Sequence, residues 1–182
     1  MLVANSSNPS LRKNWKAGSS GVRLLLDTHA PLWWLIKSPW LPVSAQNLLR
    51  SRQNTVSVSA ASAWEMATKV RLGKLYVAAE VVENFTFCQL QEEFDVIPVT
   101  VEHGIRAGLL PGPHKDPFDR MLIAQALAEN VPLVSNDRAL DGYGVKRLWQ
   151  SNSARRSPPV SAPSLLIPAV SASYVDQIGP FR

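Results

Sequence analysis

Short apolar runs alternate with longer amphipathic segments between residues 22 and 149, and this alternation is the main structural signal of the chain. Runs of mostly apolar or β-branched residues predict strands at Val22–Leu26, Thr55–Ser59, Asp95–Val99, Val131–Ser135 and Val145–Trp149. Segments with apolar residues at helical spacing predict helices at Ala30–Lys37, Ser44–Arg52, Ala60–Leu72, Ala79–Glu93, Val101–Leu109 and Pro117–Glu129. Strands separated by helices predict an α/β fold with a central parallel sheet that helices cover on both faces.

Composition divides the chain into three parts. Residues 1–20 are rich in Ser, Asn and Gly and have no apolar periodicity, which predicts a flexible leader. Residues 21–150 contain all the predicted elements and form the expected domain. Residues 151–182 are rich in Pro and Ser, which predicts a disordered tail.

The net charge of +5 belongs to the flanks, because residues 21–149 carry 13 basic and 13 acidic side chains. The overall charge is therefore no argument for nucleic-acid binding. The single Cys88 excludes an internal disulfide, and no apolar run reaches the roughly 18 residues of a membrane helix. We expect a cytoplasmic protein that has no contact with a membrane.

The candidate chemistry lies in five carboxylates where strands end or helices begin: Asp27, Glu65, Asp116, Asp119 and Asp137. In a parallel sheet the carboxyl ends of the strands share one edge, so these distant acids are expected to meet there. Carboxylates without matching cations repel one another, and a divalent metal is the usual way to hold them together. The pattern therefore favours a metal-dependent enzyme.

Each carboxylate also has a simpler structural interpretation. Asp27 follows three leucines and could cap the next helix. Glu65 could close a capping box with Ser62, although Ser59 is an equally good cap and would leave Glu65 deep in the helix. Asp116 precedes Pro117, as an N-cap does, and Asp137 could cap a short turn. The metal hypothesis therefore rests on the acids as a set.

Other residues offer weaker indications. Lys69, Arg71 and Arg120 lie close in sequence to Glu65 and Asp119, and we interpret them as phosphate-binding residues or as a solvated helix face. Trp33 and Trp34 fall on adjacent helical faces, so one is expected in the core and the other in an exposed patch. The histidines His29 and His114 could contact the substrate, although lone histidines are more often structural or solvated.

The motifs RLLLDTHAPLWWL, SAASAWEMATKVRLGKL and HKDPFDRMLIAQALAENVPLVSNDRALDGYGV, in this order, resemble the PIN-domain ribonucleases. Within that family the resemblance is closest to the toxins of VapBC-type toxin–antitoxin pairs. It covers about residues 22–149 and implies a three-layer α/β/α sandwich. It also implies an RNA substrate, a cognate VapB-like antitoxin and a homodimer.

The resemblance places metal ligands at Asp27, Glu65, Asp119 and Asp137, with Asp116 as an additional acid of the site. We expect these residues to bind Mg²⁺ or Mn²⁺ and to hydrolyse RNA phosphodiester bonds. Two alternatives stay open. One is a catalytically inactive interaction module whose acids only cap helices. The other is an Asp-dependent phosphatase, disfavoured because Asp27-Thr28-His29 departs from the D-x-D pattern.

Overall fold

The computed structural model describes residues 21–150, and the predictions for the leader and the tail lie outside these residues. Within them a five-stranded sheet has the order β3-β2-β1-β4-β5. All four strand pairings are parallel. The strands, listed along the chain, are β1 (Arg23–Leu26), β2 (Thr55–Ser59), β3 (Asp95–Ile97), β4 (Leu133–Val134) and β5 (Arg147–Leu148).

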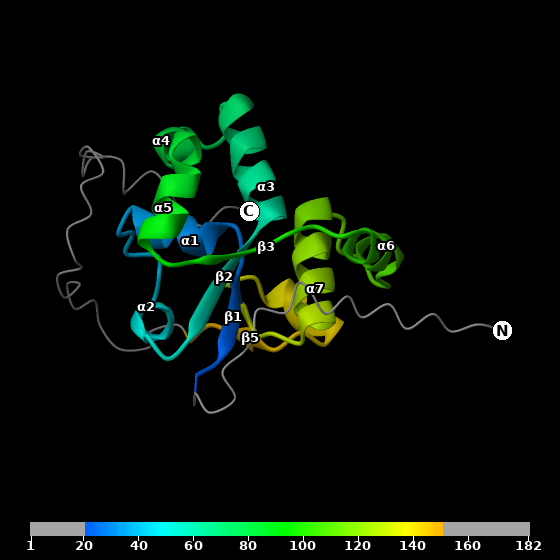
Figure 1. The fold of residues 1–182 in the computed structure, drawn as a ribbon. Coiled ribbons are helices and arrows are strands. Elements are labelled where there is room, and N and C mark those ends of the chain that lie inside the picture. The colour runs from blue at the N-terminus through cyan, green and yellow to red at the C-terminus, as the bar shows by residue number, and fades with distance from the viewer. Residues whose placement is uncertain (1–20, 151–182) are drawn as a thin grey trace.

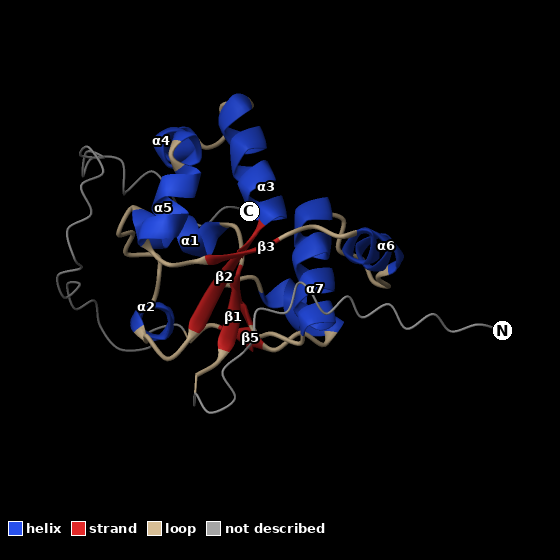
Figure 2. Cartoon of the chain, in the orientation of Figure 1, coloured by secondary structure: helices blue, strands red, loops and turns tan. Residues whose placement is uncertain are grey.

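Helices lie on both sides of the sheet, which confirms the predicted α/β/α sandwich (Figures 1 and 2). The helices of one side are α1 (His29–Leu35), α2 (Val43–Arg50), α4 (Ala79–Glu83) and α5 (Phe85–Gln91). The opposite side carries α6 (Val101–Leu109) and α7 (Pro117–Glu129), and α3 (Ala60–Arg71) follows β2 directly. Two short 3₁₀ helices, η2 (Tyr76–Ala78) and η3 (Arg138–Tyr143), complete the elements.

Alternate residues of β1 fill the two halves of the core. Leu24 and Leu26 are fully buried in one apolar cluster with residues of α1 and α2, whereas Leu25 is fully buried in a second cluster with residues of α7. This alternation follows from the two-residue period of a strand. Because helices cover both faces, β1 reads as a continuous apolar run.

The predicted helix Ala79–Glu93 is wrong as a single element. The structure divides it at Asn84, whose backbone leaves helical geometry at φ −107° and ψ 17°. The Asn84 side chain donates a hydrogen bond to the Glu80 carbonyl, so it competes with the helical hydrogen bonds of this turn. α4 and α5 therefore pack as two short helices.

Several predicted strands are shorter in the structure. The predicted strand at Val131 begins only at Leu133, because Asn130 adopts a left-handed conformation at φ 52° and the Val131 amide bonds back to Ala126. β3 ends at Ile97, one residue before Pro98, which has no amide hydrogen to donate. None of the helices between residues 21 and 150 is long and apolar enough to cross a membrane.

Candidate metal-binding site

β1 and β4 are neighbours at the centre of the sheet, where the chain order reverses. Their carboxyl ends adjoin, since the Asp27 amide donates to the Val134 carbonyl at 3.1 Å. Parallel α/β sheets bind ligands at such a reversal point. Asp27 follows β1 there, and Asp137 follows β4 three residues after its end.

Asp27 is buried, with 5% of its surface exposed. Its Oδ1 atom accepts hydrogen bonds from the amides of His29 and Ala30 at 2.9 and 3.0 Å. Asp27 therefore caps the first amides of α1, although the N-cap position itself is held by Thr28. Its place at the sheet edge leaves it available for a second role.

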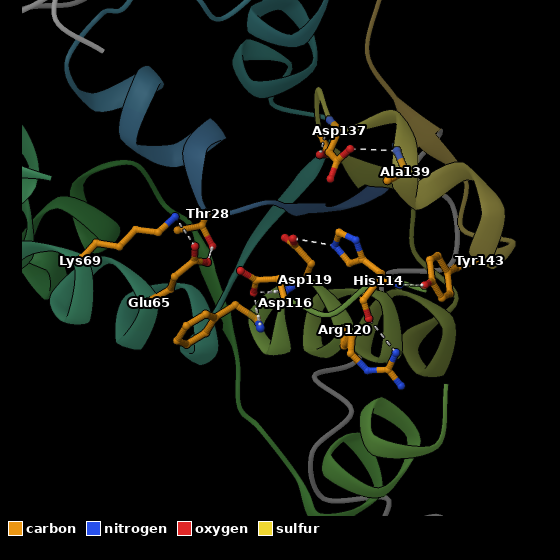
Figure 3. A network of polar contacts seen from close by, with 12 residues as sticks. Thr28, Glu65, Lys69, His114, Asp116, Asp119, Arg120, Asp137, Ala139 and Tyr143 are labelled. Atoms are coloured by element: carbon orange, nitrogen blue, oxygen red, sulfur yellow. Dashed lines mark hydrogen bonds and ion pairs between the residues drawn. The ribbon is translucent and has the colours of Figure 1, made fainter. Parts of the chain in front are cut away.

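Glu65 does not form the capping box that Ser62 suggested. The cap of α3 is Ser59, whose hydroxyl accepts from the Ala61 amide at 2.9 Å, so Glu65 lies in the second turn with 4% of its surface exposed. One carboxylate oxygen accepts the Thr28 hydroxyl at 2.5 Å, and the other pairs with the Lys69 ammonium at 2.6 Å (Figure 3). Glu65 is thus a buried anion whose charge Lys69 compensates.

Asp116 and Asp119 have separate roles at the start of α7. Asp116 is the N-cap, and its Oδ1 accepts from the amides of Phe118 and Asp119 at 2.8 and 3.3 Å. Asp119 stands in the first turn, and its Oδ2 lies 2.8 Å from Nε2 of His114 (Figure 3). The predicted capping role of Asp116 is confirmed, and the functional role of Asp119 stays a prediction.

His114, Asp119 and Asp137 converge. One ligand atom from each of the three lies within 4.8 Å of the other two. Asp137 Oδ1 also caps η3 by accepting the Ala139 amide at 2.8 Å. His114 is the site residue that sequence reasoning missed, and the available signal was its position five residues before Asp119 in the proline-rich loop.

The surroundings raise the pKa of Asp119 to about 6. Burial is the main cause, the charges of Asp116 and Glu65 add to it, and the hydrogen bond from His114 opposes it. Burial also lowers the pKa of His29, against the opposing charge of Asp27. Burial therefore disfavours the charged form of both side chains.

The three predicted phosphate-binding residues differ. Lys69 is engaged with Glu65, and Arg71 is exposed at the end of α3. Arg120 turns away from Asp119, and its guanidinium donates to the carbonyls of Ala107, Gly108, Leu110 and His114 (Figure 3). A cation with four backbone partners fixes a loop, so we leave Arg120 out of the phosphate-binding set.

The predicted exposed tryptophan patch is also wrong in part. Trp33 is buried, as expected for one of the pair. Trp34 is half-buried, donates its indole hydrogen to Glu92 at 2.6 Å and lies under the Arg50 guanidinium. Both rings therefore serve packing within the chain.

The chemistry of the donor set fits a hard divalent cation. Asp119 and Asp137 offer carboxylate oxygens, the ligands that Mg²⁺ and Mn²⁺ prefer. His114 can orient the Asp119 carboxylate, because residues that hydrogen-bond to a metal ligand commonly hold that ligand in place. Asp27 and Glu65 stand outside the grouping of three in the described part of the chain, and their role as ligands stays a prediction.

Comparison with known proteins assigns this chain to a family. The PIN domain family matches residues 24–146. The Mycobacterium tuberculosis protein "Ribonuclease VapC22" is 28% identical over 121 residues, which span 66% of this chain and 91% of that protein. In fold the chain is similar to the structure of VapBC2 from Rickettsia felis bound to a DNA fragment from its promoter. The TM-score is 0.54 and the identity 20%, over 70% of this chain and 98% of that one.

The family match covers most of the described residues and includes all five carboxylates. The resemblance that the three motifs indicated is thereby confirmed. This chain belongs to the PIN domain family.

Proposed function

We propose that this protein is a metal-dependent endoribonuclease and acts as the toxin of a toxin–antitoxin pair. The observation that carries the proposal is the convergence of Asp119, Asp137 and His114 at the reversal point of a PIN-type sheet. The similarity to a VapC ribonuclease supports RNA as the substrate. The similarity to a VapBC complex supports a VapB-like antitoxin as the partner.

Asp119 and Asp137 would hold a Mg²⁺ or Mn²⁺ ion, with Asp27 and Glu65 as further ligands and Asp116 beside them. When bound, the ion lowers the pKa of a water and offsets negative charge on the phosphate. His114 keeps Asp119 oriented from the loop side. Lys69 holds the buried Glu65 carboxylate, and the exposed Arg71 is placed to bind an RNA phosphate.

The inactive-module alternative explains only part of the site. Asp27, Asp116 and Asp137 do cap backbone amides, as that alternative requires. Glu65 and Asp119 instead contact side chains, through Thr28 and Lys69 for the former and His114 for the latter. Burying the Glu65 carboxylate and half-burying that of Asp119 has a free-energy cost that capping does not explain.

A homodimer belongs to the same proposal. Val101, Ile105 and Leu109 form an apolar stripe along α6, with exposed fractions of 80%, 59% and 79%. Contiguous exposed apolar side chains often mark protein–protein contacts. We expect the purified full chain to sediment as a dimer in analytical ultracentrifugation. The Ile105→Asp variant should shift it toward the monomer.

The nuclease proposal is tested by incubating the full chain, freed of any co-purifying partner, with total RNA in Mg²⁺, in Mn²⁺ and in excess EDTA. The Asp27→Asn variant removes a charge with little change of volume, and Glu102→Gln on the exposed face of α6 is the matched control. Cleavage that needs metal, is lost in Asp27→Asn and persists in the control supports the proposal. Cleavage insensitive to EDTA and to Asp27→Asn contradicts it.

A further inference from the structure

A cavity of about 580 Å³ lies beside the acidic edge. Residues 110–114 form one wall, and Ala139, Gly142 and Tyr143 of η3 form the other. Its volume is within the range of about 300–1,000 Å³ that is typical of small-molecule sites. The proposed nuclease chemistry leaves this cavity without a role.

The wall formed by residues 110–114 is held rigidly. Arg120 binds the carbonyls at its two ends, Leu110 at 2.6 Å and His114 at 3.1 Å. The Tyr143 hydroxyl accepts the His114 amide at 2.8 Å. Gly112 has φ 103°, and a Cβ there would lie 2.8 Å from the same hydroxyl, so the loop packs closely on Tyr143. A wall that is held by this many contacts can keep a bound ligand in one orientation.

The cavity adjoins the candidate metal site. His114 lines it and at the same time contacts Asp119. Ala139 lines it from the other side, and its amide binds Asp137. The part of a ligand that extends out of the cavity on this side would therefore lie beside Asp119 and Asp137.

We infer that this cavity binds one nucleobase of the RNA, next to the phosphodiester bond that is cut. This assignment rests on the proposed nuclease function. The lining contains no Lys or Arg, so it does not suit a phosphate. It does contain the rings of His114 and Tyr143, with centroids 6.2 Å apart in an edge-to-face arrangement. Apolar walls and aromatic rings bind the flat face of a base.

Gly142 lines the cavity and has room for a larger side chain. A Cβ at Gly142 meets no atom within 4 Å, and the same holds for Gly104 on α6, which is not part of the cavity. Gly142→Leu is therefore the test variant and Gly104→Leu the matched control. Gly142→Ala provides a smaller step should the leucine variant fail to fold.

The substrate is a 5′-labelled RNA oligomer whose cleavage position has been mapped, with abasic versions at each nucleotide flanking that position. For the wild-type full chain, we expect one abasic substitution to lower kcat/KM by roughly 10- to 100-fold. Gly142→Leu should cleave the intact RNA as slowly as the wild type cleaves that abasic RNA, and it should show no further abasic effect. Gly104→Leu should behave as the wild type.

An active wild type with no abasic effect overturns the assignment. So does a Gly142→Leu variant that folds and keeps the full abasic effect. Both results leave the nuclease function intact. If the wild type neither cleaves nor binds the oligomer, the proposed function fails, and the base-binding assignment fails with it.

Discussion

Nε2 of His114 lies 2.8 Å from Oδ2 of Asp119, and this contact joins the proline-rich loop to the first turn of α7. The histidine thereby fixes the direction of a carboxylate that the proposed function requires. A His114→Phe change keeps an aromatic ring but removes both ring nitrogens. We expect it to lower Mn²⁺ affinity roughly 10- to 100-fold, as the loss of a ligand's second partner commonly does. Unchanged affinity by calorimetry would show that Asp119 needs no such partner.

The pKa of Asp119 leads to a pH dependence of metal binding. Because this pKa is raised to about 6, Asp119 of the metal-free fold becomes protonated as the pH falls below 6, and a cation must then displace that proton. Affinity should be highest above pH 7 and fall as the pH drops through 6, approaching about tenfold per pH unit below it. Calorimetric titrations between pH 5 and 8 measure this trend. A flat profile, or one equally steep in Asp119→Asn, would contradict the assignment.

Removing Lys69 should destabilise the metal-free protein. Its ammonium pairs with Glu65 at 2.6 Å, and the Glu65 side chain is only 5% exposed. Lys69→Gln leaves that buried charge without compensation, so we expect a loss of about 1–3 kcal/mol in the free energy of unfolding. Urea unfolding in EDTA measures this difference in the free energy of unfolding between the wild type and Lys69→Gln. Saturating Mn²⁺ should make the difference smaller if a cation also compensates the charge of Glu65. Equal losses with and without Mn²⁺ would place the metal away from Glu65.

Arg120 should matter for stability. Its guanidinium donates to four backbone carbonyls, and charged donors contribute more than neutral ones. We expect Arg120→Ala to lower the free energy of unfolding by about 2–4 kcal/mol. Arg106→Ala is the control, since Arg106 forms a surface pair with Glu102, and such a pair contributes about 0.3–0.5 kcal/mol. Similar losses for the two variants would mean that the loop does not depend on Arg120.

The layered fold could be predicted because each local pattern agrees with the architecture. The leucines before Asp27 are apolar without alternation, as a strand covered on both faces requires. The break at Asn84 was missed because residues 79–93 have acceptable helical periodicity throughout, and one asparagine decides against a continuous helix. The late start of the strand predicted from Val131 was missed for a similar reason, since it depends on the left-handed conformation of Asn130.

The sequence indicated which residues could meet at the site, but it did not indicate which side chains contact one another. Asp119 and Asp137 could be inferred because they follow, or begin, elements that share one sheet edge. His114 could not, since its approach to Asp119 depends on how a proline-rich loop folds back. The direction of Arg120 was equally hidden, because its four carbonyl partners lie on residues 107–114 rather than beside it in the helix. Sequence spacing does not determine which way a long side chain points.

The most direct test of the metal site is a titration of Mn²⁺ into the full chain, followed by electron paramagnetic resonance in the absence of RNA. Wild type and Glu102→Gln should bind Mn²⁺ saturably, and Asp119→Asn and Asp137→Asn should each lose most of that binding while they stay folded. Equal Mn²⁺ binding by all four proteins would contradict a metal site at Asp119 and Asp137, and so would the absence of binding in the wild type.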